Sequence, residues 1–372
     1  MKSFLLPLPS QRTTNNPRSL LTVTATQQHC LGVPDSPPLP SNRHIALQRT
    51  RSTLRCLRQR PDLLDHYNDI ITDQLRRGFI EKVPADTLPA DRVHYLPHHH
   101  VEKASSTTPI RIVYDCSCRA SRNGVSLNDC LHPGPPLVAD LTTILTRFRL
   151  KRYALTADIE KAFPQIGLAP QDRDVTRFFW HDPDAQDLDG LMNIYRFKVL
   201  LFGATSSPFI LHATVRKHLA SADSDTARLL QDSLYVDNAV TGVDTVEDAS
   251  RFCREATALM LNGGFRLRSW ACNDSELQSV FTTDGVADSN TTVPVLGLQW
   301  NVAANTLQFT QHAVIPAQSP VTKRTALQIV SRVYDPLGLM SPVTISAKIF
   351  LQDLWKQNIG WDDWLPDDLQ QR

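Results

Sequence analysis

The sequence predicts a globular α+β fold. Segments of strand and helix character follow one another along 372 residues without the regular βαβ period that is typical of parallel α/β folds. The chain contains no internal repeat, and its length provides ample material for a buried core in one large domain or in two to three smaller ones. With 41% hydrophobic and 21% charged residues, the composition excludes a wholly disordered or fibrous chain.

The first half of the chain begins with a segment of distinct composition. Residues 1–42 are rich in Pro, Thr, Ser, Asn and Gln and lack an apolar period, which predicts a flexible lead-in. Farther along, periodic leucines mark helices, and runs of β-branched and aromatic residues mark strands. The elements expected are helices within residues 42–82 that stop at Gly78, strands at Val93–Leu96 and Ile110–Tyr114 around a turn at 105–109, a helix at Ala139–Phe148, and a strand at Tyr153–Ala157.

Local signals are clearer in the second half. Ser206-Ser207-Pro208 provides a capping hydroxyl and an early proline for the helix that follows. Residues of β type on both sides of Asp237-Asn238 predict a tight hairpin with these two residues at its tip. Thr245 and Asp248 resemble a capping box. The other elements expected are a helix that ends at Gly263-Gly264, strands at Val293–Trp300 and Thr306–Phe309, and helices at Lys323–Val333 and Val343–Gln357.

Charge is distributed unevenly along the chain. The net charge of +1 argues by itself against a nucleic-acid partner. However, residues 1–152 carry 21 basic and 12 acidic side chains, whereas residues 153–372 carry 18 basic and 26 acidic ones. A basic half beside an acidic half predicts a track for a polyanion next to a site that gathers cations. The alternative is a chance distribution of solvated charges.

The compartment is predicted from cysteine usage and from apolar runs. Seven cysteines scattered over a long chain do not form a disulfide framework, so we expect a reducing, intracellular environment. The apolar stretch that opens the chain is interrupted by Pro7 and Pro9 and is too short for a signal peptide. No apolar run approaches the ~18 residues of a membrane helix, so no membrane partner is expected.

Two aspartates occupy positions from which they can hold cations together. Asp158 ends an apolar strand, and Asp237 lies in the predicted hairpin. If the two strands are neighbours in one sheet, both carboxylates converge on hard cations such as Mg²⁺. A pair of such ions about 3.5–4 Å apart promotes phosphoryl transfer. Each aspartate taken alone is more often a turn or capping residue.

These segments and their neighbours resemble the reverse transcriptase of BEL/Pao long-terminal-repeat retrotransposons. The resemblance runs from about Asn42 to the end of the chain, with its motifs in the family's order. The matching segments are Leu96–Val101 and Arg111–Asp115 (fingers), Leu155–Ile166 (first palm motif), Leu201–Phe209 (template and nucleotide loop), Tyr235–Asn238 (Tyr-x-Asp-Asp box), Gly263–Trp270 (after the palm helix), Leu296–Trp300 (primer grip), and Tyr334–Pro342 (after the polymerase).

The resemblance implies a right-hand polymerase fold with a ferredoxin-like split βαβ sheet in its palm and a partial thumb or connection. The domains implied are a lead-in at 1–42, helices and fingers at 43–152, a palm with primer grip at 153–306 that contains a fingers insertion at about 168–199, and the start of the thumb or connection at 307–372. No RNase H or integrase segment is expected after Arg372, so a complete polyprotein is excluded. Whether the chain is a fragment of a longer polyprotein, and which oligomeric state it has, stay open.

The resemblance also implies roles for individual residues. Two Mg²⁺ ions, with Mn²⁺ as an alternative, would be held by Asp158, Asp237 and the Ile159 carbonyl, and Asn238 completes the catalytic box. Phe163 matches the aromatic residue that crowds a ribose 2′-hydroxyl; its alternative role is core packing. The remaining residues implied are Lys103 and Arg111 at the triphosphate, Gly203 beside the nascent base pair, and Leu296, Gly297 and Leu298 in the primer grip.

The implied activity is RNA-directed DNA synthesis from dNTPs on a primed RNA or DNA template, in the cytoplasm or in retroelement particles. Two residues depart from the family pattern. Asn238 stands where the family has a second Asp, so the site loses one negative charge, and Ser269 stands where relatives carry a lysine. A relic that binds nucleic acid without polymerising it is therefore the alternative function. A peptidase is a third reading, although no nucleophile or aspartic dyad is recognisable.

A zinc site is the alternative use of the cysteines and histidines that precede residue 120. Cys116 and Cys118 lie near His98, His99 and His100 in the sequence. A single Cys-x-Cys pair does not have the spacing of a zinc site, so we expect the three histidines to lie beside the fingers strand instead.

Overall fold

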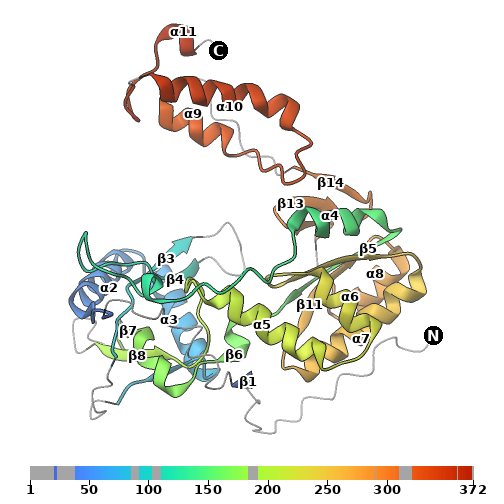
Figure 1. Cartoon of the computed structure of the whole chain (residues 1–372). Coiled ribbons are helices and arrows are strands. Elements are labelled where there is room, and N and C mark those ends of the chain that lie inside the picture. Colours follow the sequence, from blue (N-terminus) through green and yellow to red (C-terminus); the bar gives the residue numbers. More distant parts are fainter. Residues whose placement is uncertain are drawn as a thin grey trace.

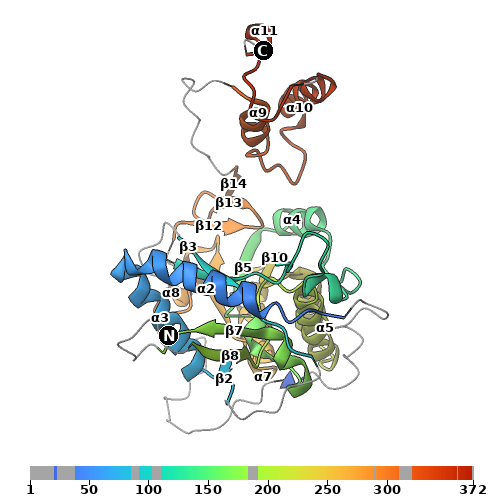
Figure 2. The same cartoon turned by 90° about the vertical axis from the view of Figure 1, so that its left-hand side faces the viewer.

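The structure is a computed structural model of the whole chain, shown in Figures 1 and 2. It describes the backbone of residues 21–22 and all of residues 38–84, 92–102, 110–182, 192–288, 290–309, 321–357 and 359–370. Most of the predicted lead-in, the predicted turn at 105–109 and Lys103 therefore lie outside the described residues. Two lobes lie side by side, and a unit of C-terminal helices projects from one of them.

The lobe on the left of Figure 1, which contains α2 and α3, is called the first lobe, and the lobe on the right is called the second. A four-stranded antiparallel sheet forms the centre of the second lobe. Its strands lie in the order β11-β5-β10-β9, so β5 pairs with two later strands, β11 on one side and β10 on the other. Because successive side chains of a strand point to opposite faces, a sheet covered on both faces needs apolar residues at nearly every position. The strands are β5 (Tyr153–Ile159), β9 (Leu234–Tyr235), β10 (Asn238–Val243) and β11 (Leu267–Cys272).

Helices cover one face of this sheet. Leu155 and Ala157 of β5 and Ala239 of β10 belong to the main core, which the apolar faces of the covering helices complete. Leu211, Val215 and Leu219 are buried on one helix, as their helical spacing predicts. The helices are α5 (Ser207–Ala220), α6 (Asp225–Ser233), α7 (Val246–Asn262) and, beside β11, α8 (Ser275–Thr283).

The opposite face is covered by α4 (Leu141–Leu150) and a small three-stranded sheet. Ala154, Val240 and Ala271 of the central sheet face a second hydrophobic cluster here. Trp300 is fully buried, and its ring meets the edge of Phe148 at a centroid distance of 5.0 Å. The small sheet comprises β12 (Thr292–Val295), β13 (Leu298–Asn301) and β14 (Thr306–Gln308).

Among the residues that the structure describes, the first lobe contains two α-helices, one three-stranded sheet and one pair of antiparallel strands. The sheet has the order β2-β8-β7, which joins a strand near residue 80 to two strands more than 90 residues later. The elements are α2 (Arg43–Arg58), α3 (Pro61–Arg76), β2 (Ile80–Lys82), β3 (His98–Glu102), β4 (Ile110–Tyr114), β7 (Arg177–Trp180) and β8 (Asn193–Phe197). Short elements connect the lobes: the 3₁₀ helices Asn128–Cys130, Phe163–Gln165 and Pro170–Thr176, and β6 (Ile166–Gly167), which pairs with β1 (Leu21–Thr22).

The C-terminal unit consists of α9 (Lys323–Val330), α10 (Ser341–Lys356) and α11 (Asp367–Gln370). Its small core contains Ala326, Leu354, Leu365 and Leu369. The Lys323 ammonium is buried and lies 5.0 Å from the ring centroid of Trp355 and 5.7 Å from that of Trp361. These cation–π contacts link the start of α9 to the end of α10 and to the segment after it. No helix among the residues described combines the length and apolar content that crossing a bilayer requires.

Several expectations are confirmed with shifted boundaries. The helices at 42–82 stop before Gly78, which has a φ of 72°, but residues 80–82 form β2 and are not helical. The Thr245 hydroxyl caps α7 by accepting a hydrogen bond from the Asp248 amide at 3.1 Å. The predicted strand at Val293–Trp300 is a hairpin, because Leu296 and Gly297 form the turn between β12 and β13.

Three expectations are wrong in detail. The strand expected at Val93–Leu96 makes only an isolated bridge at Tyr95, and β4 pairs instead with His98–Glu102. Ser206 does not cap α5 through its hydroxyl, which is buried without a hydrogen-bond partner. The tip of the β9–β10 hairpin is Val236-Asp237, one residue earlier than expected, so Asn238 is the first residue of β10.

A buried ionic network holds the sheet of the first lobe together. Asp174 Oδ1 accepts hydrogen bonds from Arg177 Nε at 2.8 Å and from Arg196 Nη1 at 2.9 Å, and Glu81 accepts from Arg196 Nε at 2.8 Å. The side chains of Asp174 and Arg177 are each 9% exposed. Burial by itself raises the pKa of Asp174, but the hydrogen bonds from Arg196 and Arg177 outweigh it and lower the pKa below its usual value.

Replacing Asp174 should therefore destabilise the protein. In Asp174→Asn, two guanidinium groups lose their shared negative partner inside the lobe, and we expect the free energy of unfolding to fall by about 3 kcal/mol in urea titrations. The control is Asp232→Asn, which removes an exposed ion pair with Arg147 and should change stability by less than about 0.5 kcal/mol. Equal losses in the two variants would contradict the structural role of the network.

Candidate active site

The pairing of β10 with β5 brings the two predicted metal-binding aspartates together. Asn238 lies directly opposite Asp158 in the register of the two strands, and the Ile159 amide donates a hydrogen bond of 2.7 Å to the carbonyl of Asp237. Asp158 is the penultimate residue of β5, with β11 on one side and β10 on the other. The convergence of two carboxylates from separate segments, which the sequence predicts, is thus present.

The hairpin that carries Asp237 has an unusual backbone. Val236 has a φ of 54°, in the left-handed region that β-branched residues rarely adopt. The strain of such a residue is of order 1–3 kcal/mol and persists only when the surroundings enforce it. The Val236 side chain packs against the main core, and the neighbouring Tyr235 packs against the second cluster. The tip is therefore held from both faces of the sheet, which fixes where Asp237 lies.

Each carboxylate is engaged by one donor on one of its oxygens. Arg268 Nε donates to Asp158 Oδ2 at 3.1 Å, and Asn238 Nδ2 donates to Asp237 Oδ1 at 2.9 Å. Asp158 Oδ1 is buried without a hydrogen-bond partner. Burial raises the pKa of Asp237, the nearby Asp158 carboxylate adds to the rise, and Arg111 opposes it. Two half-buried carboxylates of the same charge and an unsatisfied oxygen favour a bound cation.

The residues present fit a divalent cation with oxygen ligands. Mg²⁺ is usually held by one or two carboxylates, with substrate phosphates and water supplying the rest. Asp158 and Asp237 provide the carboxylates, and Asn238, whose amide nitrogen donates to Asp237, adds no charge. No group of three or more His, Cys, Asp or Glu side chains converges on one point within the described ranges. Any ion here depends on ligands that the substrate brings.

An aromatic and cationic stack connects β4 to the segment after β5. The Arg111 guanidinium lies 4.6 Å from the ring centroid of Phe202, and Phe202 meets Phe163 edge to face at 4.6 Å. Phe163 is 5% exposed, whereas Phe202 is 43% exposed. The Phe202 ring is therefore the one that solvent or a ligand can reach, and the buried Phe163 ring packs against it. The sequence places Phe202 in a candidate loop, but nothing in its local pattern assigns it this contact.

Gly203 brings the loop before α5 close to the end of β4. Its φ is 95°, and a Cβ there would lie 3.2 Å from the Tyr114 carbonyl oxygen. Asn128 fixes the loop: its amide nitrogen donates to the Gly203 carbonyl at 2.9 Å, and its amide oxygen accepts from the Thr205 amide at 2.9 Å. Sequence reasoning missed Asn128, because this contact joins residues 75 positions apart and has no local signal.

The predicted primer-grip residues lie in the β12–β13 hairpin. Leu296 and Gly297 form its two-residue turn with φ values of 48° and 91°, and Leu298 begins β13. Leu296, Leu298 and Tyr235 belong to the same hydrophobic cluster, which connects this turn to the hairpin of Asp237. A Cβ on Gly297 would lie 2.4 Å from the ring of Tyr334, so the glycine allows this ring to pack on the turn.

Three of the residues considered for a zinc site, His98, Cys116 and Cys118, are buried. His98 is fully buried, accepts a hydrogen bond from the Tyr67 hydroxyl at Nδ1, and donates from Nε2 to the Phe179 carbonyl at 2.7 Å. Its ring also packs against Tyr114, Phe178 and Trp180. Burial lowers the pKa of His98 to about 4. Because both ring nitrogens are engaged, His98 is not available as a metal ligand.

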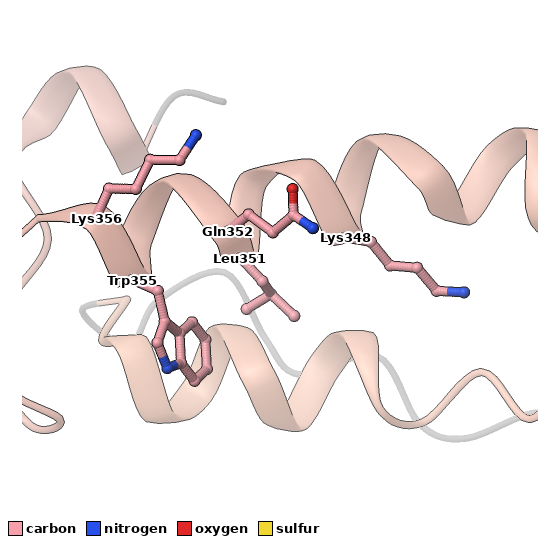
Figure 3. A pocket seen from close by; sticks show the side chains of 5 residues that line it. All are labelled: Lys348, Leu351, Gln352, Trp355 and Lys356. Atoms are coloured by element: carbon pink, nitrogen blue, oxygen red, sulfur yellow. The ribbon is translucent and has the colours of Figure 1, made fainter.

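A pocket is present on the C-terminal helix α10, away from the two carboxylates (Figures 1 and 3). It is lined by Lys348, Leu351, Gln352, Trp355 and Lys356. Figure 3 shows the Trp355 indole pointing toward the neighbouring helix, in agreement with its contact with Lys323. None of these five lining residues is acidic, and the pocket does not belong to the carboxylate site.

The C-terminal residues match a known family. Residues 322–372 match the Pao retrotransposon-like RNaseH-like domain. This match confirms the resemblance of Tyr334–Pro342 to a segment of BEL/Pao polyproteins. No curated protein sequence matches the chain.

Three solved structures of the foamy viral protease-reverse transcriptase have a similar fold. A complex of the dRH form with double-stranded DNA has a TM-score of 0.54 over 82% of this chain and 46% of that one. A second complex with double-stranded DNA has a TM-score of 0.52 over 82% and 55%, and a complex with an RNA/DNA hybrid has 0.50 over 82% and 35%. The sequence identity is 17% in each case, so this likeness shows the fold.

These comparisons support a retroelement Pol region with a mixed α/β fold similar to that of a retroviral reverse transcriptase. The chain spans about half the length of the first solved structure, 46%.

The buried histidine gives the first lobe a defined pH dependence. The folded-state pKa of His98, about 4, lies below the usual 6.5, so its contribution to stability is complete above pH 6.5 and is lost as the pH falls toward 4. The loss should reach roughly 3 kcal/mol in urea titrations.

His98→Gln should be less stable at pH 7 and should lose less stability between pH 6.5 and 4 than the unmodified protein. His44→Gln alters an exposed histidine of α2 and should keep the original pH dependence. An unchanged pH profile in His98→Gln would contradict the assignment.

Proposed function

We propose that the chain is the reverse transcriptase region of a retroelement Pol protein and catalyses RNA-directed DNA synthesis from dNTPs. One observation carries the proposal: the pairing of β10 with β5 brings Asp237, in the turn before β10, next to Asp158 of β5, whose Oδ1 is buried without a hydrogen-bond partner. The two carboxylates, the order of the motifs in the sequence and the fold point to the same class of enzyme. The proposed palm is the central sheet with α5–α7, the proposed fingers are the first lobe, and the helices α9–α11 begin the thumb or connection.

The chemistry requires little from the protein except position and charge. Two Mg²⁺ ions, when bound, would lower the pKa of the primer 3′-hydroxyl and neutralise the leaving pyrophosphate. Asp158, Asp237 and the Ile159 carbonyl are the proposed ligands, and the Asn238 side chain contacts Asp237 through its amide nitrogen. Burial and the Asp158 carboxylate raise the pKa of Asp237, so positive charge bound at this site would favour its deprotonated form.

The surrounding residues have proposed roles in holding the substrates. Arg111 faces the same space as Asp237 and would bind the triphosphate, with Lys103 on the adjoining segment. The Phe202 ring, supported by Phe163, would lie against the sugar of the incoming nucleotide. Gly203 would let the backbone approach the nascent base pair.

An RNase H-like hydrolase is a second candidate, because the matching family carries that name. Such an enzyme needs its own cluster of carboxylates. Asp362 is paired with Arg324 at 2.6 Å, and no acidic cluster of three forms within the described parts of residues 322–370. The polymerase therefore accounts better for the acidic side chains that do converge.

The decisive experiment measures dNTP incorporation on a primed RNA template with Mg²⁺ or Mn²⁺. We expect weak incorporation by the natural sequence, at least tenfold faster incorporation by Asn238→Asp, which restores a charge at the metal site, and loss of at least about a hundredfold in Asp158→Ala. The control Asp244→Asn removes an exposed carboxylate at the far end of β10 and should leave the rate unchanged.

Two outcomes would decide between enzyme and relic. If only Asn238→Asp incorporates nucleotide, the natural chain is a relic that retains the fold. If neither the natural chain nor Asn238→Asp incorporates it, the polymerase proposal is wrong.

The proposal also predicts salt-dependent binding to a primed duplex. Some of the arginines on α2 are already neutralised, since Arg49 pairs with Asp115, but Arg51 and Arg55 are exposed one turn apart. Binding should weaken on the order of a hundredfold between about 50 and 200 mM salt if roughly four phosphates are contacted. Fluorescence anisotropy measures it, and Arg51→Gln with Arg55→Gln should lower the slope by about 2.

The control for this measurement is Arg228→Gln, which removes an exposed arginine of α6 that pairs with Asp223 and Asp225. This variant should retain the full slope. A binding constant that does not change with salt would exclude a track of phosphate contacts on this chain.

A further inference from the structure

We infer that Arg268 is an internal counter-ion of the carboxylate site and competes with divalent cations for Asp158. The inference rests on the proposed function, which makes Asp158 a metal ligand. It adds a residue that sets how tightly this site binds a cation. Neither the fold nor the family match assigns a role to Arg268.

The strand pairing places Arg268 against Asp158 by backbone geometry. Arg268 of β11 lies directly opposite Asp158 of β5 in the register. Its Nε donates to Asp158 Oδ2 at 3.1 Å, and the two side chains are 50% and 28% exposed. Because the Cα positions are fixed by the sheet, the guanidinium stays within reach of the carboxylate whenever no other cation occupies that oxygen.

A β-bulge directly after Arg268 supports this placement. The register shifts between Arg268 and Ala271, and Ser269 within the bulge has a φ of 52°. A bulge inserts an extra residue, so the residues after it are displaced relative to β5, while Arg268 itself remains paired. Trp270, the next residue, is buried against Phe252 and Phe281, which anchors the bulged strand.

The ion pair between Arg268 and Asp158 lowers the negative charge that is available to a cation. Asn238 contributes no charge, so the site has the two negative charges of Asp158 and Asp237. Arg268 neutralises one of them directly, and Arg111 acts on the other through space. A divalent cation must therefore displace Arg268 from Asp158 Oδ2 or bind with one carboxylate oxygen already occupied. Since Arg268 is half exposed, it can move into solvent when a cation enters.

The test measures Mn²⁺ binding to the full chain without substrate, from the electron paramagnetic resonance signal of free Mn²⁺. Arg268→Gln should bind Mn²⁺ about fivefold more tightly, the factor expected for an ion pair worth about 1 kcal/mol. Arg268→Lys keeps the positive charge and should retain the original affinity. Arg266→Gln is the matched control, because Arg266 has a similar exposure and pairs at 3.7 Å with Glu160, which lies two residues from Asp158. The Mn²⁺ affinity of this variant should equal that of the unmodified protein.

The same measurement in an Asp158→Asn variant shows whether Mn²⁺ binds at the carboxylate site. In Asp158→Asn, Mn²⁺ affinity should fall, and adding Arg268→Gln should give no gain. If Asp158→Asn lowers the affinity but Arg268→Gln does not raise it, the counter-ion inference is wrong while the metal site stands. If Asp158→Asn binds Mn²⁺ as tightly as the unmodified protein, the carboxylate site itself is not a metal site, and both proposals fail.

Discussion

The antiparallel pairing of β10 with β5 is the constraint on which the rest of the structure depends. Side chains alternate between the faces of a sheet, so a shift of one residue in this register would turn every side chain of β10 to the other face. The observed register sends Ala239 to the main core and Val240 to the second cluster. The same register puts Asn238 opposite Asp158 and holds the Asp237 carbonyl on the Ile159 amide. Core packing and site geometry are thus set by one set of backbone hydrogen bonds.

Local chemistry in the sequence was sufficient to predict the parts of the site that lie on one strand or one turn. Asp158 follows a continuous apolar run, and the hairpin residues around Asp237 have strong strand character on both sides. The one-residue error at the hairpin tip has a physical cause. Val236 adopts a left-handed φ that glycine or asparagine normally supplies, so residue preferences pointed to Asn238 as a turn residue.

Contacts between distant segments were not predictable in this way. Arg268 and Asp158 form a hydrogen bond although they are 110 residues apart in the sequence. The position of Arg268 depends on a strand register and a bulge that have no signal in the local sequence. The strand His98–Glu102 was missed because three consecutive histidines are weak strand formers. Tertiary contacts override that preference: His98 satisfies both ring nitrogens inside an aromatic cluster that β7 and α3 supply. The pairing of β2 with β8 likewise has no signal in the local sequence.

The packing of Tyr334 on Gly297 affects how the C-terminal helices can move. Tyr334 and Leu337 lie between α9 and α10, and they pack on the Gly297 turn and on the second cluster, so they attach this segment to the second lobe. A side chain added at Gly297 would meet the Tyr334 ring and weaken this attachment. The placement of the C-terminal helices therefore depends on a glycine of the β12–β13 turn.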